Sequence, residues 1–325
     1  MEALDSVVVV RDYEPKDNGG VHYNFTNDFA MESLDFQICM GCLYSIVFIV
    51  GVFGNALVAF VVIRNVHMRT VTNIFIANLA FSDILLCFLG IPFTPLYTFM
   101  ETWSFGGPMC YLLTYSQGVS IYISTFTLTS IAADRFHVIL FPLRPRMKTE
   151  TCVFIVVAIW IAALILTLPY GLNMKFFTQD GIDYCEEEWT ESDMRIFSTF
   201  TTTLQFVIPF LIIAICYGCV SVRLNRRTKN RPGCSNSRRE EADRERNRKT
   251  NRMLIAMVVV FAVCWMPLNL CNIVIDFNTE IENWRYYKAF FFIAHLIAMS
   301  STCYNPFLYA WLNENFKKEF KLVSR

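Results

Sequence analysis

Charged residues are scarce in this chain. Only 17% of the 325 residues are Asp, Glu, Lys or Arg, whereas a soluble domain normally holds about a quarter. Hydrophobic residues make up 54% of the sequence. This balance argues against a soluble enzyme with one large core and favours a protein with several membrane-spanning segments.

Histidine is also scarce, and common hydrolase motifs are lacking. The four histidines are scattered over different segments, and neither an HExxH nor a GxSxG motif is present. We therefore expect no enzyme. The two halves of the chain lack the internal symmetry and broken helices that mark many transporters. A formal net charge of zero gives no indication of nucleic-acid binding.

Long apolar runs are what the sequence does have. About 20 apolar residues are needed for a helix to cross the hydrocarbon layer, and these runs are too long for membrane strands. We therefore predict an all-α membrane protein with seven spans and a short amphipathic eighth helix. The predicted spans are 38–63, 73–98, 109–139, 151–170, 196–222, 250–276 and 287–310.

The charges that remain are grouped in blocks, and the blocks define the topology. Residues 1–37 hold eight acidic and two basic residues, whereas 223–252 hold twelve basic and four acidic residues. Basic residues follow the odd-numbered spans, and "DGIDYCEEEW" at 180–189 lies on the other side. By the positive-inside rule the N-terminus is extracellular.

Four segments follow from that topology. They are an outer tail at 1–37 with a glycosylation acceptor at Asn24, the bundle at 38–310, a basic inner loop 3 at 223–252, and an amphipathic end at 311–325. We expect the middle of the basic loop to be flexible and its ends to extend the fifth and sixth spans.

Ionisable residues inside spans are candidates for function. Asp83 lies in the middle of the second span without a basic partner, and helical spacing lets Ser124, Asn305 and Asn55 reach it. A carboxylate with hydroxyl and amide oxygens suits Na⁺, and a protonated Asp83 held by amides is the alternative.

Asp134 and Arg135 end the third span. They can pair at the membrane rim and later separate, or Arg135 can simply extend its side chain to the interface. Prolines inside spans remove a backbone hydrogen bond and kink helices, which suits helices that move. These prolines are Pro92, Pro169, Pro209, Pro267 and Pro306.

The sixth span ends in "WMPLNLCNIVID" at 265–276, with a carboxylate at its outer end. Steps of three and four residues put Phe261, Trp265, Leu268, Asn272 and Asp276 on one face. An acid at a helix C-terminus opposes the helix dipole. A cation arriving from outside would relieve this repulsion, and a solvated rim acid is the alternative.

The motifs together resemble rhodopsin-like G-protein-coupled receptors. The resemblance covers about 38–322 and rests on "GN" at 54–55, "NLAFSD" at 78–83, "DR" at 134–135, "CWMP" at 264–267 and "NPFLY" at 305–309. Within that class, "PFTPLYTFMETWSFG" at 92–106 and "AHLIAMSSTCYNPFLYAWLNENF" at 294–316 are similar to neuropeptide Y receptors and their invertebrate neuropeptide F relatives.

The resemblance implies a receptor for a peptide ending in Arg-Phe-amide or Arg-Tyr-amide. The peptide arginine would pair with Asp276 and the terminal amide would meet Gln117. Further ligand contacts would come from Asn272, His295, Tyr97, Thr94, Gln205 and Phe291. Gln117 stands where amine receptors carry Asp, which argues against an amine, and no lysine in the seventh span could hold retinal.

The resemblance also implies the signalling parts. It predicts a Cys110–Cys185 disulfide, a plasma-membrane location, and partnership with a Gi/o protein, arrestin and membrane lipid. An allosteric Na⁺ ion is the one expected cofactor. The predicted activation switch consists of Asp134, Arg135, Trp265, Phe261, Pro267, Pro209, Tyr217, Asn305, Pro306 and Tyr309.

Two departures from the family pattern keep alternatives open. Phe136 replaces the usual polar residue after Arg135, and Thr125 replaces a common Ile. A non-signalling or constitutively active protein therefore remains an alternative. So does a receptor for an RF-amide peptide of another family.

Overall fold

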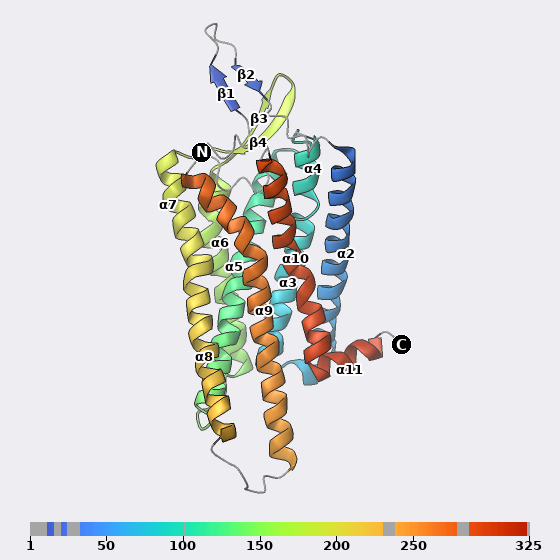
Figure 1. Ribbon diagram of the computed structural model, residues 1–325, viewed down its shortest axis with the longest axis vertical. Coiled ribbons are helices and arrows are strands. Elements are labelled where there is room, and N and C mark those ends of the chain that lie inside the picture. The colour runs from blue at the N-terminus through green and yellow to red at the C-terminus, as the bar shows by residue number, and fades with distance from the viewer. Residues whose placement is uncertain are drawn as a thin grey trace.

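A bundle of long helices forms the body of the protein (Figure 1). The structure is a computed structural model that describes residues 12–15, 21–24, 33–100, 102–229, 238–277 and 286–323. Short strands lie beyond one end of the bundle, and a short helix lies across the other (Figure 1). The seven-helix expectation is confirmed.

The seven spans are built from single helices, except the second and the fifth. The fifth is α7 and α8 joined by the π turn η2, and the second is α3 followed by α4. Their bounds are α2 Leu34–Arg64, α3 Val71–Leu89, α4 Phe93–Met100, α5 Gly107–Leu140, α6 Thr149–Leu172, α7 Glu191–Thr202, η2 Thr203–Val207, α8 Ile208–Lys229, α9 Arg238–Phe277 and α10 Tyr287–Leu312.

Length and composition support the membrane assignment. Five of the spans in the described part of the chain are long and apolar enough to cross a membrane on these criteria alone. They are the spans of α2, α3 with α4, α6, α7 with α8, and α9. The remaining two, α5 and α10, have 34 and 26 residues and are less apolar on average than α2, α3 and α6.

Prolines explain both broken spans. Proline has no N–H and disfavours helical backbone in the residue before it. The helix α3 therefore stops at Gly90, and α4 starts after Pro92. In the fifth span Pro209 cannot donate to the carbonyl four residues earlier, and the chain forms the η2 π turn at that point.

Buried polar side chains brace the bundle at its centre. Asn78 of α3 donates to Thr127 of α5 at 2.8 Å and accepts from the indole of Trp160 on α6, also at 2.8 Å. Three helices are thereby held by one amide. A satisfied buried network of this kind fixes one packing arrangement.

Strands at the outer end were not predicted. In the described residues β1 Asp12–Pro15 pairs with β2 Val21–Asn24, and β3 Met174–Gln179 pairs with β4 Ile182–Glu187. The turn between β3 and β4 is Asp180-Gly181, and both residues have positive φ, 54° and 80°. Asp-Gly is a strong hairpin signal, so this strand pair could have been found from the sequence.

At the inner end α8 continues to Lys229 and α9 begins at Arg238, so both helices extend into the basic loop. The middle of that loop, 230–237, lies outside the described residues. A 3-10 turn η1, Val66–Met68, links α2 to α3.

The short helix α11, Glu314–Val323, is amphipathic as predicted. Phe316 is fully buried and stacks on Tyr309 with ring centroids 5.3 Å apart. Glu319 accepts from Asn65 at 2.6 Å, and Glu314 pairs with Lys249 of α9 at 3.3 Å. The helix is therefore held by an aromatic stack and by polar contacts to two other segments.

Close packing of α2 on α10 depends on Gly54. A Cβ at this position would lie 2.8 Å from Cγ of Pro306, which is part of a rigid ring. We expect Gly54→Ala to separate the helices and destabilise the detergent-solubilised protein by about 1–3 kcal/mol. A thermal melt measures this change.

Gly218→Ala on α8 is the matched control, because nothing lies within 4 Å of its Cβ position. The control should melt at or slightly above the wild-type temperature, since Ala favours helix over Gly. Equal melting of both variants would show that the Gly54 contact does not constrain the bundle.

Candidate functional site

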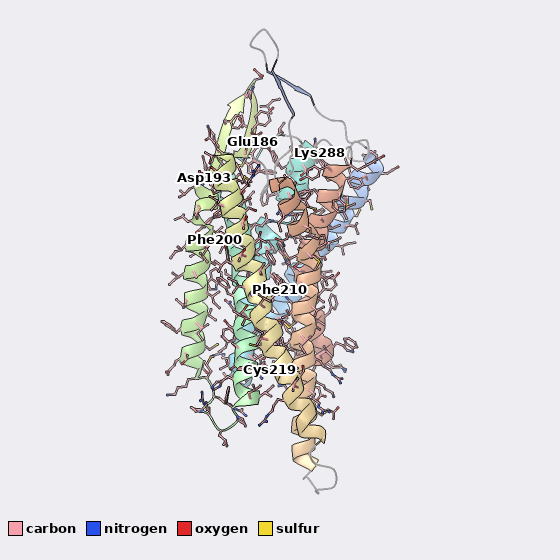
Figure 2. The ribbon with its side chains drawn as sticks, turned by 60° about the vertical axis from the view of Figure 1, so that its left-hand side comes forward. Glu186, Asp193, Phe200, Phe210, Cys219 and Lys288 are labelled. Carbon is pink, nitrogen blue, oxygen red and sulfur yellow. A yellow bond between two sulfur atoms is a disulfide. The ribbon has the colours of Figure 1, made fainter. Side chains whose placement is uncertain are left out.

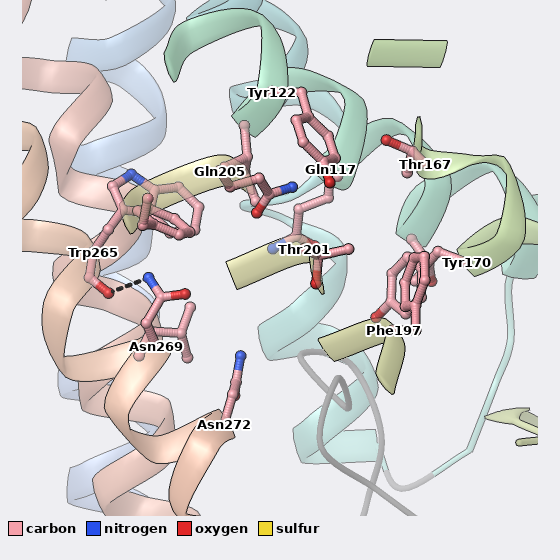
Figure 3. A pocket seen from close by; sticks show the side chains of 15 residues that line it. Gln117, Tyr122, Thr167, Tyr170, Phe197, Thr201, Gln205, Trp265, Asn269 and Asn272 are labelled. Carbon is pink, nitrogen blue, oxygen red and sulfur yellow. Dashed lines mark hydrogen bonds between the residues drawn. The ribbon is translucent and has the colours of Figure 1, made fainter. Parts of the chain in front are cut away.

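A cavity lies between the outer halves of α5, α6, α7 and α9 (Figure 3). It contains three of the residues predicted to bind ligand: Gln117, Gln205 and Asn272. Its full lining is Thr114, Gln117, Gly118, Ile121, Tyr122, Thr167, Tyr170, Phe197, Thr201, Gln205, Phe206, Trp265, Leu268, Asn269 and Asn272. The walls are mainly apolar and aromatic with a few polar groups, as is usual for a ligand site.

The predicted face of the sixth span is confirmed where the structure describes it. Trp265, Leu268 and Asn272 all line the cavity. Phe261 lies one turn deeper and contacts Trp265 with ring centroids 5.8 Å apart. The helical period of α9 was therefore enough to identify this wall.

Gln117 is held from behind by a chain of hydrogen bonds. Its Nε2 lies 3.4 Å from Nε2 of His295, whose Nδ1 lies 2.8 Å from the hydroxyl oxygen of Tyr44. The Tyr44 hydroxyl donates to the carbonyl of Phe292 at 3.3 Å. When the Tyr44 hydroxyl donates to Phe292, it accepts from the imidazole, and His295 then carries its proton on Nδ1.

This proton arrangement determines what Gln117 can offer to a ligand. With Nδ1 protonated, Nε2 of His295 is an acceptor, and the Gln117 amide N–H₂ donates to it. The Gln117 carbonyl oxygen then remains available as an acceptor. Asn272 provides a second acceptor, because its buried Oδ1 has no hydrogen-bond partner among the described residues.

Other predicted ligand residues lie away from this cavity. Tyr97 is buried under the outer hairpin, 3.5 Å from the carbonyl of Cys185, and Thr94 donates to the backbone of Gly90 at 3.1 Å. Phe291 contacts Tyr287 nearer the outer end of α10. None of these three lines the cavity.

Asp276 lies in the last turn of α9, four residues after Asn272. Its side chain is outside the described part of the structure. The helix thus continues the predicted face outward, from the cavity wall at Asn272 towards the extracellular rim. Asn24, the predicted glycosylation acceptor, lies at the end of β2 opposite Asp12, and its side chain also falls outside the described part.

The β3–β4 hairpin is fixed against the outer end of α5. The predicted disulfide between Cys110 and Cys185 is confirmed. In addition, the backbone N–H of Trp103 donates to the carbonyl of Asp183 at 2.8 Å. Glu186 and Asp193 also lie at this end (Figure 2). The outer entrance is therefore covalently constrained and carries acidic side chains.

The inner end of α5 holds an ion pair. Arg135 donates to Oδ2 of Asp134 from Nη2 at 2.6 Å and from Nε at 3.2 Å, and a further Nη2 contact reaches Thr72. Of the two arrangements left open by the sequence, the structure shows the ion pair at the rim. Arg135 is thereby tied to both α5 and α3.

Two tyrosines of the predicted switch lie near this end with buried hydroxyls. Neither Tyr217 nor Tyr309 has a hydrogen-bond partner for its hydroxyl among the described residues. An unsatisfied buried hydroxyl costs about 1–3 kcal/mol. A rearrangement that gave both hydroxyls partners would recover part of that free energy.

Comparison with known proteins agrees with this arrangement. The model of the family "7 transmembrane receptor (rhodopsin family)" matches residues 54–309. The chain is 36% identical to neuropeptide Y receptor type 6 of Mus musculus over 295 residues, which are 86% of this chain and 78% of the relative. It is 35% identical to neuropeptide Y receptor type 2 of Homo sapiens over 296 residues, which are 88% of this chain and 76% of the relative.

The chain belongs to the neuropeptide Y receptor family of rhodopsin-like G-protein-coupled receptors. It is a multi-pass plasma-membrane receptor with an extracellular N-terminus, and it is not an enzyme. The outer cavity and the Arg135 region therefore lie on opposite sides of the membrane.

The receptor also brings part of the predicted polar cluster together. Asp83 accepts from Asn305 at 2.9 Å. Ser124 lies 3.0 Å from Ser82 instead, and the amide of Asn55 donates to the carbonyls of Gly51 and Thr302 at 2.9 Å each. The buried Oδ1 of Asn55 has no partner among the described residues.

The sequence analysis missed Tyr44, which contacts His295 behind Gln117. Positions 44, 48, 51 and 55 step by four, three and four, which puts Tyr44 on the face of "GN" at 54–55 that packs on α10. Extending this face of α2 towards its outer end would have identified Tyr44. The sequence analysis also missed three cavity residues, Phe197, Thr201 and Tyr170. The π turn η2 changes the helical phase, so the face of Phe197 and Thr201 could not be extrapolated from α8.

Proposed function

We propose that the receptor binds a peptide ending in Arg-Phe-amide or Arg-Tyr-amide. The curated relatives are named for neuropeptide Y, and the cavity offers acceptors without a buried charge of its own among its lining residues. An amidated end supplies N–H donors and no negative charge. The peptide end thus matches the polarity of the cavity.

The hydrogen-bond chain from Tyr44 through His295 to Gln117 is the observation that supports this ligand best. It leaves the Gln117 oxygen to accept from the terminal amide. A free carboxylate is acceptor-only and would face that oxygen without a proton between them. If the Gln117 amide were turned round, the site would offer N–H groups and favour a carboxylate instead.

The peptide arginine is assigned to Asp276, one turn outward from Asn272. Guanidinium and carboxylate form two parallel charge-assisted hydrogen bonds, which are stronger than neutral ones. Acidic residues at the outer end, among them Glu186 and Asp193, would attract a basic peptide before it docks. The negative rim thus favours the arginine of the peptide, and the neutral cavity favours its amidated end.

Signalling follows from a shift between two states of the bundle. The bound peptide would favour a state in which α9 pivots near Pro267, with Trp265 and Phe261 repacking. Arg135 would leave Asp134, and the hydroxyls of Tyr217 and Tyr309 would gain partners. The opened inner surface would bind a Gi/o protein, which lowers cAMP, and then arrestin. Differential affinity for the two states drives the shift.

The test is a concentration–response of cAMP inhibition in transfected cells. Amidated Arg-Phe and Arg-Tyr peptides are compared with their free-acid forms, with surface expression measured in parallel. A response to the amides alone would support the ligand and the Gi/o assignment. Silence to all peptides with receptor at the surface would contradict both, and low cAMP without peptide would indicate a constitutively active receptor.

A sodium ion at Asp83 is a second part of this proposal. The carboxylate, the Asn305 side chain and the unpartnered Asn55 oxygen lie in the receptor interior. We expect Na⁺ to lower agonist affinity in the wild type by at least about fivefold, the lower end of typical allosteric coupling. Asp83→Asn should reduce that effect to less than about twofold.

Radioligand competition in NaCl and in choline chloride of equal ionic strength separates the ion from general screening. Wild-type affinity that is the same in both salts would contradict the sodium site. An Asp83→Asn receptor that keeps the full sodium effect would move the site elsewhere.

A further inference from the structure

An apolar groove opens on the lipid-facing side of the bundle at its inner end. It lies between α9 and α10, next to α11, and has a volume of about 510 Å³. Its lining is Val260, Tyr304, Phe307, Leu308, Ala310, Trp311 and Lys317. The ligand cavity and the groove share no residue, so this is a separate site.

The aromatic walls of the groove are open to the surroundings. Phe307 is 61% exposed and Trp311 is 78% exposed. From Tyr304 to Trp311 the groove follows α10 for seven residues, which is about 10 Å of helix. This length and apolar lining suit an acyl chain that lies along α10.

Lys317 stands at the α11 end of the groove. No carboxylate in the described part of the receptor pairs with its ammonium group. Lys249, by contrast, is held between Glu245 and Glu314. The groove thus ends in a positive charge that no carboxylate of the described residues neutralises.

The position of that charge identifies its counterpart. α11 lies at the inner end of the bundle, where anionic lipids give the cytoplasmic leaflet a negative surface potential. A lipid with one chain in the groove would bring its phosphate to the level of Lys317. Basic pockets between spans on the cytoplasmic side are known to suit anionic headgroups.

We propose that this groove is a binding site for an anionic phospholipid of the inner leaflet. One acyl chain packs against Phe307 and Trp311, and the headgroup pairs with Lys317. A bound lipid would contact both α9 and α10, so it would be displaced or reshaped when the inner ends of these helices separate. The site therefore gives the inner leaflet a direct contact with the moving part of the receptor.

The experiment uses the indole of Trp311 as the reporter. The full-length receptor is placed in nanodiscs with brominated-chain phosphatidylserine or brominated-chain phosphatidylcholine at the same low mole fraction. Subtracting the signal of Trp311→Phe isolates the quenching of Trp311. We expect about fivefold stronger quenching by the serine lipid, the ratio that one favourable lysine–headgroup interaction gives.

Lys317→Gln should bring that ratio close to one. Lys318→Gln is the matched control: it removes the same charge from the same exposed helix but does not line the groove, so the ratio should persist. Equal loss in both variants would show only diffuse attraction and overturn the proposal. Equal quenching by both lipids in the wild type would do the same, and no quenching by either would also overturn the proposal, because neither lipid then reaches the groove.

Discussion

An Asp276→Ala receptor is expected to respond to the amidated arginine peptide with ten- to several hundred-fold lower potency than the wild type. The substitution leaves the peptide guanidinium partly desolvated and without its partner. Removing one member of such a pair costs about 2–3 kcal/mol. The cAMP concentration–response measures the shift, with surface receptor counted by an epitope tag.

A control variant separates the arginine pair from a general loss of negative charge. Asp180→Asn removes an acid from the tip of the β3–β4 hairpin, at an exposed position with a positive φ that Asn tolerates. It should change potency less than about threefold, since only long-range attraction is affected. Unchanged potency in Asp276→Ala would refute the arginine assignment.

A peptide with citrulline in place of arginine completes the argument. Citrulline keeps the shape of the side chain but is neutral. If Asp276 meets this arginine, the two changes should not add, because either one alone already removes the pair. Additive losses would place the arginine against another acid of the outer rim.

The second large effect is on amide-over-acid selectivity. We expect the wild type to prefer the amidated peptide to its free acid by at least about 100-fold, because the acid places a buried charge against the Gln117 oxygen. Tyr44→Phe removes the acceptor that keeps the proton of His295 on Nδ1. The proton of His295 can then move to Nε2, and the Gln117 amide can turn. The amide-over-acid potency ratio should therefore fall about tenfold.

The amide-over-acid potency ratio should fall for two reasons: the amide loses potency and the acid gains it. Tyr111→Phe removes a hydroxyl from an exposed position on α5 and should leave the ratio unchanged. Equal losses for both peptides in Tyr44→Phe would mean that Tyr44 only supports the fold. Agonist dose–response curves for the six peptide–receptor pairs are sufficient.

Where a helix is unbroken, the helical period of the sequence correctly predicted which residues line the cavity. Trp265, Leu268 and Asn272 line one wall of the cavity, as steps of three and four along α9 required. Their helix contains Pro267 but remains continuous through it. The spans, their order and the Cys110–Cys185 bridge were predicted for a related reason, since hydropathy and family motifs are local features of the sequence.

Prediction failed where the helical phase was interrupted. Thr94 and Tyr97 follow the break at Gly90, so their faces could not be extrapolated from α3. Tyr97 lies under the hairpin and Thr94 donates to the backbone of Gly90, so neither lines the cavity. The contact between His295 and Tyr44 joins residues 251 positions apart, and no local pattern encodes such a pairing.

The π turn at Thr203–Val207 has a consequence for how the receptor could change. A π turn holds one residue more than an α turn, and each residue of a regular helix turns the chain by about 100° and advances it by about 1.5 Å. Deleting a single residue there would remove the π turn, although Pro209 would still leave one carbonyl unpaired, and would rotate α7 relative to α8.

Phe197 and Thr201 would then leave the cavity, while every residue from Ile208 to Lys229 would keep its place. The deletion of one residue would thus change the surface that faces the ligand and leave the inner half of the span unchanged. Ligand specificity could change in one step without altering the inner surface that binds the G protein.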